Sequence, residues 1–158
     1  MCPSRKPNRL KGYDYRQKGY YFITICTKDR HELLWNQPYV GARIARPLLS
    51  GIGIIVEKAI KNIPQIYESI TIDKYVIMPN HIHLIIIVSE RCGRAMRAPT
   101  ISTVINQMKG FVSKQIGHSI WQKLFHDHII RNESGYIKIW HYIDENPTNW
   151  QTDCFYPK

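Results

Sequence analysis

Two histidines open the most hydrophobic segment of the chain, the stretch NHIHLIIIV at residues 80–88. Side chains alternate across a β-strand, so His81 and His83 should share one face, with Ile85 and Ile87 further along it. Imidazoles are costly to bury, yet these two lead a strand that is apolar on both faces. Two neutral imidazoles on a rigid strand could bind a metal ion together. A His-x-His pair is also compatible with a structural role, so a metal site needs a third ligand and a reacting group.

A helix near the C-terminus could supply both groups. Tyr142 and Asn146 are four residues apart, which places them on one helical face. At about 100° per residue they lie at the margin of an apolar stripe, where a side chain can extend along the sheet surface. The stripe comprises Tyr136, Ile137, Ile139, Trp140 and Ile143. A phenol becomes a covalent nucleophile when a metal or a base helps to remove its proton, and an amide oxygen suits Mg²⁺ or Mn²⁺. Neither residue is decisive alone, because the chain has ten tyrosines and helix C-termini favour asparagine.

Other residues compete for these roles. His126 and His128 share a face of the strand before this helix and could form a second metal-binding pair, with Asp127 on the opposite face. Tyr136 is a rival nucleophile, but its place in the apolar stripe favours a core position.

The chain carries a strong excess of positive charge, with 22 Lys and Arg against 12 Asp and Glu and a formal net charge of +10. Such an excess favours a polyanionic partner, most often nucleic acid, although a basic protein can also be merely soluble. A basic N-terminal arm at about residues 1–18 contains Arg5, Lys6, Arg9, Lys11, Arg16 and Lys18 against one acid, Asp14. Together with the rings of Tyr13 and Tyr15, these cations suit single-stranded DNA, and Arg131 could contact its backbone. The alternative is an arm that is simply disordered.

The length of 158 residues and the apolar content of 44% predict a single globular domain. The longest apolar run, Leu84 to Val88, is too short to cross a bilayer, and no leader peptide is recognisable, so we expect a soluble, cytoplasmic protein without a membrane partner. The four cysteines are widely spaced, which indicates reduced thiols rather than a zinc knuckle or a disulfide framework.

Hydrophobic periodicity predicts alternating elements in the order β-α-β-β-α-β-α. We expect strands at residues 20–27, 69–77, 81–89 and 120–131, and helices from Ile52 to Pro64, from Ile101 to Ile116 and from the N-cap Asn132 to about Asn146. The pattern at residues 36–51 supports no assignment. This order is typical of an α+β, ferredoxin-like two-layer sandwich, with an antiparallel sheet and helices packed on one face.

Four stretches carry a family resemblance: RLKGYDYRQKGYYFITICT, YVIMPNHIHL, WQKLFHDHIIRNE and YIDENP. Together they resemble the REP-associated tyrosine transposases, which belong to the HUH single-strand DNA transposases and nucleases. The resemblance runs from about residue 9 to the C-terminus. It implies the same ferredoxin-like fold.

The resemblance also implies roles for individual residues. His81 and His83 match the two HUH histidines, Tyr142 matches the nucleophile, and Asn146 matches the polar metal ligand one helical turn later. The implied reaction is an attack on single-stranded or hairpin-forming DNA with Mg²⁺ or Mn²⁺ as cofactor. It leaves a 5′-phosphotyrosine link and a free 3′-OH, and it needs no nucleotide cofactor.

Three functions therefore remain open from the sequence. The first is a tyrosine-dependent DNA transposase or single-strand endonuclease. The second is a domesticated, non-catalytic protein that binds DNA hairpins, and the third is a metal-dependent hydrolase in which His81 and His83 help to activate water. Relatives are often dimers, so both a homodimer and a monomer are compatible with the sequence.

Overall fold

The computed structural model describes residues 11–36, 48–89 and 99–157. Their regular elements follow the predicted order β-α-β-β-α-β-α. The strands are β1 (Gly19–Cys26), β2 (Ile70–Ile77), β3 (His81–Val88) and β4 (His126–Ile130), and the helices are α1 (Gly51–Ile66), α2 (Ile101–Ile116) and α3 (Glu133–Glu145). Short 3-10 turns at Lys28–Arg30 and Trp150–Thr152 complete the set.

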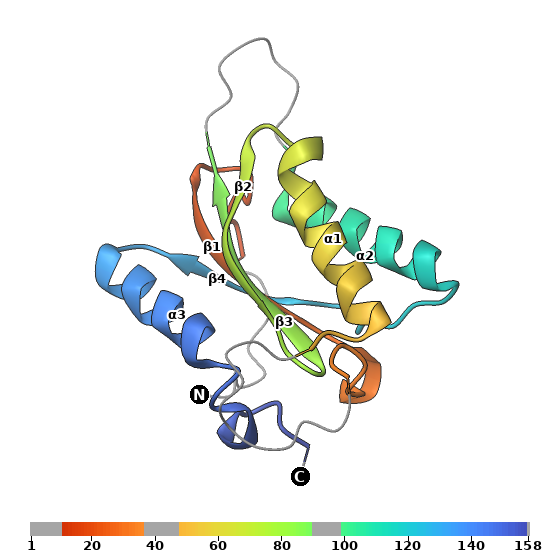
Figure 1. The fold of residues 1–158 in the computed structure, drawn as a ribbon. Helices are drawn as coiled ribbons and strands as arrows, with labels where there is room; N and C mark the ends of the chain where they lie inside the picture. The colour runs from red at the N-terminus through yellow and green to blue at the C-terminus, as the bar shows by residue number, and fades with distance from the viewer. Residues whose placement is uncertain (1–10, 37–47, 90–98, 158) are drawn as a thin grey trace.

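The four strands form one antiparallel sheet in the order β2-β3-β1-β4 (Figure 1). β2 and β3 are joined by a tight turn, as the hairpin prediction required, and β1 enters between β3 and β4. This strand order and the two-layer packing of α1 and α2 confirm the predicted α+β, ferredoxin-like class.

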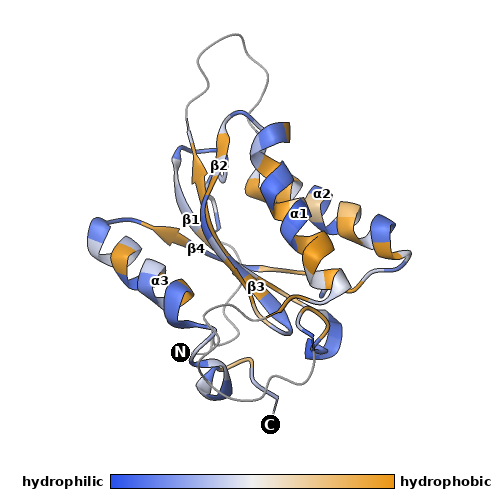
Figure 2. Cartoon of the chain, viewed as in Figure 1, coloured by the Kyte–Doolittle hydropathy of each residue, from blue (hydrophilic) through white to orange (hydrophobic). Residues whose placement is uncertain are grey.

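The sheet is covered on both faces, by different helices. Alternate residues of β1, such as Tyr21, Ile23 and Ile25, join the main core beneath α1 and α2. The intervening face packs against α3 through a separate cluster that contains Ile85, Ile130 and Ile143. Figure 1 shows α3 on the opposite side of the sheet from α1 and α2, and Figure 2 shows hydrophobic residues running along the strands between them. The expectation of helices on one face therefore holds for α1 and α2 and is wrong for α3.

Two predicted boundaries are also wrong. α1 continues through Pro64 to Ile66, because a proline in the last turn removes only one backbone donor and Tyr67 N–H still bonds to the Ile63 carbonyl. The strand expected at residues 120–131 is regular only over β4, since Trp121 pairs with Thr27 in an isolated bridge. Of the unassigned segment 36–51, residues 37–47 lie outside the described part of the chain.

Side-chain caps begin α1, α2 and α3. Ser50, Thr100 and Asn132 accept hydrogen bonds from the backbone N–H of Gly53, Thr103 and Gly135, respectively. The Asn132 cap fixes the start of α3, whose C-terminal turn carries the predicted nucleophile. Across the described ranges, none of the helices has the length and apolar character needed to cross a bilayer.

Candidate active site

The two histidines of β3 converge on one another. Nε2 of His81 lies 3.1 Å from Nε2 of His83, and the two rings meet edge to face with centroids 4.6 Å apart. Both side chains point to the α3 face of the sheet, as the strand alternation predicted, and both are fully buried.

Hydrogen bonds to Nδ1 orient both rings. The Asn80 amide donates through Nδ2 to the carbonyls of Phe155 and Arg30, at 2.8 and 3.3 Å, so its Oδ1 is the atom that faces His81. His81 Nδ1–H donates to this oxygen at 2.8 Å, which leaves a lone pair on His81 Nε2. The Thr24 hydroxyl lies 2.8 Å from His83 Nδ1 and can accept in the same way. With both Nδ1 atoms protonated, two Nε2 lone pairs point into the same space, as a cation requires.

Burial keeps both histidines neutral. Loss of solvent, reinforced by the nearby Arg30 charge, lowers the pKa of His81 to about 3. Burial and the neighbouring His81 lower the pKa of His83 well below its usual value. Neutral imidazole is the form that binds metal ions, so both residues are in the ligating state at physiological pH.

The C-terminal turn of α3 brings Tyr142 against His83, and the C-cap Asn146 lines the same pocket as Tyr142. The Tyr142 hydroxyl lies 3.4 Å from His83 Nε2, and Phe22 packs against both the imidazole and the phenol ring. Asn146 is 3% exposed and donates through Nδ2 to Asp153 Oδ2 at 2.9 Å. Its Oδ1 is buried and has no hydrogen-bond partner among the described residues.

β2 holds α3 in this position. A bulge between Ile72 and Lys74 inserts Asp73 as an extra residue, and Asp73 and Lys74 both contact α3. Asp73 accepts a hydrogen bond from the Tyr136 hydroxyl at 2.7 Å.

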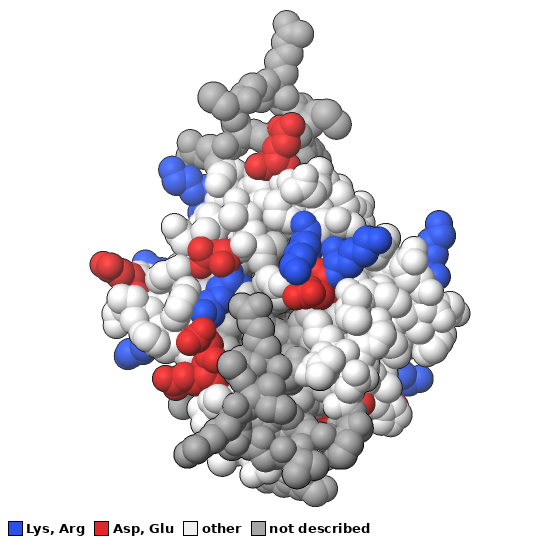
Figure 3. Space-filling model, in the orientation of Figure 1, with Lys and Arg blue, Asp and Glu red and all other residues white. Residues whose placement is uncertain are grey.

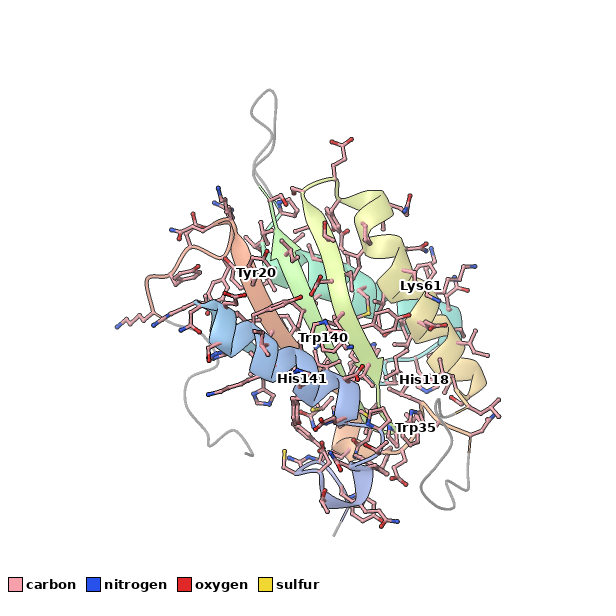
Figure 4. All side chains as sticks on the ribbon, turned by 60° about the vertical axis from the view of Figure 1, so that its left-hand side comes forward. Tyr20, Trp35, Lys61, His118, Trp140 and His141 are labelled. Carbon is pink, nitrogen blue, oxygen red and sulfur yellow. The ribbon has the colours of Figure 1, made fainter. Side chains whose placement is uncertain are left out.

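Lys74 makes a further contact between β2 and α3. Lys74 Nζ lies 2.6 Å from Asp144 Oδ1 and 3.2 Å from the centroid of the Trp140 ring. Figure 4 shows Trp140 on the sheet side of α3 and His141 extending away from it.

Tyr142 borders an open pocket of about 170 Å³. The pocket is lined by Tyr142, Glu145, Asn146, Asn149, Thr152, Asp153 and Cys154. The tyrosine is 38% exposed, so a ligand can reach its hydroxyl, whereas the histidines lie behind it. Partial burial and the Asp153 carboxylate raise the pKa of Tyr142 well above its usual value. The free phenol is therefore protonated at physiological pH and needs an electrophilic partner to react.

This group of residues fits a divalent ion. Two adjacent ligands of an octahedral ion, each about 2.1 Å from it, lie about 3 Å apart, close to the 3.1 Å between the histidine Nε2 atoms. Asn146 Oδ1 is a buried oxygen that lacks a partner, and an amide oxygen is a ligand that Mg²⁺ and Mn²⁺ accept. No cluster of three or more His, Cys, Asp and Glu suited to a metal occurs among the described residues, so a third protein ligand for an ion at this place would be of another residue type.

The predicted DNA-binding residues lie elsewhere, and only in part within the described chain. Arg5, Lys6 and Arg9 lie outside the described residues. Lys11, Arg16, Lys18 and Arg131 are exposed, whereas Tyr13 and Tyr15 are half-buried against Tyr21 and the main core.

The strand register places Lys18 and Arg131 at the far end of the sheet from the histidines. Lys18 precedes β1, and Arg131 follows β4 at the same end, because Tyr20 pairs with Ile130. Thr24, which contacts His83, lies four residues beyond Tyr20 along β1, a distance of about 13 Å. On the face shown in Figure 3, basic and acidic side chains of the described residues are intermixed, without one continuous basic patch.

The alternative metal pair, His126 and His128, and the alternative nucleophile, Tyr136, form less complete sites. His126 is half-buried and His128 is exposed on β4, and no third His, Cys, Asp or Glu joins them within the described ranges. The Tyr136 hydroxyl is engaged by Asp73, and its ring packs against Tyr20.

Three further residues shape the site and were not identified from the sequence. Asn80 and Thr24 orient the histidines, and Asp153 contacts both Tyr142 and Asn146. Asn80 directly precedes His81 in the sequence, and this proximity could have identified it as a residue of the site. Thr24 and Asp153 come from distant segments, and only the tertiary structure brings them in.

Comparison with known proteins places the chain among relatives. No protein-family model matches it. An uncharacterized protein of Haemophilus influenzae is 35% identical over an alignment of 173 positions, which covers 96% of this chain and 93% of that protein.

Solved structures of similar fold include those of two other proteins. The REP-associated tyrosine transposase bound to a REP hairpin matches with a TM-score of 0.66 and 23% identity, over 90% of this chain and 74% of the other. A candidate transposase from Deinococcus radiodurans R1 matches with a TM-score of 0.50 and 17% identity, over 87% of this chain and 95% of the other. The fold implied by the family resemblance is thereby confirmed. The chain belongs to the same family as the Haemophilus influenzae protein, and its fold is that of the REP-associated tyrosine transposase.

Proposed function

We propose that this protein is a metal-dependent DNA strand transferase that uses Tyr142 as its nucleophile on single-stranded or hairpin-forming DNA. The observation that carries the proposal is the position of the Tyr142 hydroxyl, 3.4 Å from His83 Nε2, in a pocket that Asn146 also lines. The similarity in fold to a transposase whose structure contains a REP hairpin supports DNA of that kind as the substrate.

The protein side of the metal site is His81, His83 and Asn146. A Mg²⁺ or Mn²⁺ ion bound there would neutralise charge on the scissile phosphate and make phosphorus more electrophilic. Each protein ligand is already oriented by a neighbour, so little reorganisation is needed on binding.

Tyr142 forms the covalent bond. Its phenolic oxygen attacks phosphorus, the bond from phosphorus to the 3′ oxygen breaks, and the downstream fragment stays attached through its 5′ phosphate. The proton lost by the phenol is balanced by the proton gained by the departing 3′ oxygen. The 3′-OH can later attack the phosphotyrosine and restore a phosphodiester, so the bond energy is conserved and the reaction needs no nucleotide cofactor. The exposed cations at the far end of the sheet would hold DNA that enters the site.

The test is a single incubation of the full-length chain with labelled hairpin DNA and Mn²⁺. Hairpins taken from the DNA flanking its gene are the natural substrates to try. A 3′-end label should move to the protein and survive denaturation, and a 5′-end label should appear on a shorter fragment that a polymerase can extend. Binding without cleavage would support the hairpin-binding protein instead. Cleavage without a covalent adduct would support a hydrolase that activates water.

A further inference from the structure

Asp153, in the segment that follows α3, contacts both Tyr142 and Asn146. Its Oδ2 accepts a hydrogen bond from Asn146 Nδ2 at 2.9 Å and lies 3.5 Å from the Tyr142 hydroxyl. Its Oδ1 accepts a hydrogen bond from the backbone N–H of Phe155 at 2.7 Å. Both carboxylate oxygens are thus engaged, and the carboxylate is held in one orientation.

We propose that Asp153 is a positioning residue that selects which end of the Asn146 amide is presented to the metal ion. The inference rests on the proposed function, because it assigns a purpose to the free Oδ1 of Asn146. It extends the metal site into the segment that follows α3.

The argument depends on what a carboxylate can and cannot do. An ionised carboxylate only accepts hydrogen bonds, so it can face the NH₂ group of Asn146 and repels its oxygen. The amide is planar, and fixing Nδ2 on Asp153 therefore fixes Oδ1 on the other side. That oxygen is the one that is buried without a partner among the described residues.

The same arrangement recurs at each proposed ligand. Asn80 fixes the His81 ring through Nδ1, and Thr24 contacts Nδ1 of His83. Asp153 completes the set for Asn146. Residues that orient metal ligands in this way commonly change metal affinity about 10- to 100-fold when they are replaced.

Asp153→Asn is the most specific test. It keeps the size of the side chain and removes the carboxylate that can face only the NH₂ group of Asn146. An asparagine at this position can offer either an oxygen or an NH₂ group, so the Asn146 amide could turn its NH₂ toward the metal. We expect Mn²⁺ affinity, measured by electron paramagnetic resonance of free Mn²⁺ on the full-length chain without DNA, to fall about 10- to 100-fold.

Two further variants separate orientation from charge. Glu145→Gln removes a carboxylate from the same pocket but leaves the hydrogen bond between Asn146 and Asp153 in place, and should change the affinity less than about twofold. Asn146→Ala should itself weaken binding, and in that background Asp153→Asn should have no further effect, because there is no amide left to orient.

The outcomes distinguish this inference from the proposed function. If the unmodified protein binds no Mn²⁺, the proposed metal site is wrong. If it binds Mn²⁺ and Asp153→Asn binds equally well, Asp153 does not position Asn146. An effect of Asp153→Asn that persists in the Asn146→Ala background, or is matched by Glu145→Gln, would also overturn the inference. Thermal unfolding of each variant checks that the loss of affinity is not a loss of structure.

Discussion

The hydroxyl of Tyr142 lies 3.4 Å from Nε2 of His83, although the two residues are 59 positions apart in the chain. The sheet supplies the imidazole, and a helix packed on the opposite face from α1 and α2 supplies the phenol. The site therefore depends on the docking of α3 as much as on the histidine pair.

The first prediction concerns the histidines as ligands. His83→Ala should reduce Mn²⁺-dependent adduct formation on the order of 100-fold or more, because one of two converging lone pairs is lost. Single-turnover assays at saturating DNA measure this effect. His141→Ala is the matched control, since His141 is exposed on the outer side of α3 (Figure 4) and should leave the rate unchanged. Equal losses in both variants would contradict a specific role for His83.

The second prediction concerns the attachment of α3 to β2. Lys74→Met removes the ion pair with Asp144 and the contact of the ammonium with Trp140, together worth about 1 kcal/mol. Backbone amides of α3 should then exchange with deuterium about fivefold faster, measured by mass spectrometry of peptides covering residues 133–145.

Lys61→Met serves as the control for that experiment. Lys61 pairs with Glu57 within α1, so its replacement should leave exchange in α3 unaltered. Unchanged exchange in Lys74→Met would show that the lysine does not hold the helix.

The third prediction concerns stability and pH in the metal-free protein. Burial lowers the pKa of His81 to about 3 and lowers that of His83 well below its usual value, whereas both titrate near 6.5 when unfolded. Below about pH 6.5 the unfolded chain binds protons that the folded chain does not, so the free energy of unfolding should fall as the pH falls. The slope should be roughly 1.4 kcal/mol per pH unit for each histidine.

Urea unfolding at pH 7.5, 6.0 and 5.0 measures this slope. The variant with both His81→Gln and His83→Gln should lose most of the slope, whatever its absolute stability. A slope that is the same in the variant would place the titrating groups elsewhere.

The fourth prediction contrasts two helical glycines. A Cβ at Gly53 would collide with the carbonyl oxygen of Leu34, so Gly53→Ala should destabilise the protein by about 1–3 kcal/mol. A Cβ at Gly110 in α2 meets nothing within 4 Å, so Gly110→Ala should stabilise it by about 0.5–1 kcal/mol. Thermal or urea unfolding of the two variants would measure opposite signs. A destabilised Gly110→Ala or a neutral Gly53→Ala would show that the packing around these positions differs.

The residue pairs of the site could be predicted from the sequence because strand alternation and helical spacing are local patterns. Strand alternation predicted that His81 and His83 share a face, and helical spacing predicted that Tyr142 and Asn146 do. In the structure His81 and His83 lie side by side, and Tyr142 and Asn146 line one pocket. That these residues bind metal or react with DNA remains a prediction.

Other features depend on contacts that no local pattern records. The side of the sheet that α3 covers depends on its long-range packing with Ile85 and Ile130, and the bulge at Asp73 is a register shift between two strands. Asp153 lies beyond the end of α3, where periodicity gives no direction for a side chain. The predicted end of α1 at Pro64 was wrong because a proline in the final turn costs only one hydrogen bond.

The most direct test of the central claim is covalent adduct formation by Tyr142→Phe, compared with Tyr136→Phe. Both variants lose one phenolic hydroxyl on α3, but only Tyr142 lies beside His83 and Asn146. With Mn²⁺ and 3′-labelled hairpin DNA, Tyr142→Phe should form no adduct while binding the hairpin within about twofold of the unmodified protein, whereas Tyr136→Phe should still form it. An adduct that persists in Tyr142→Phe would contradict the account.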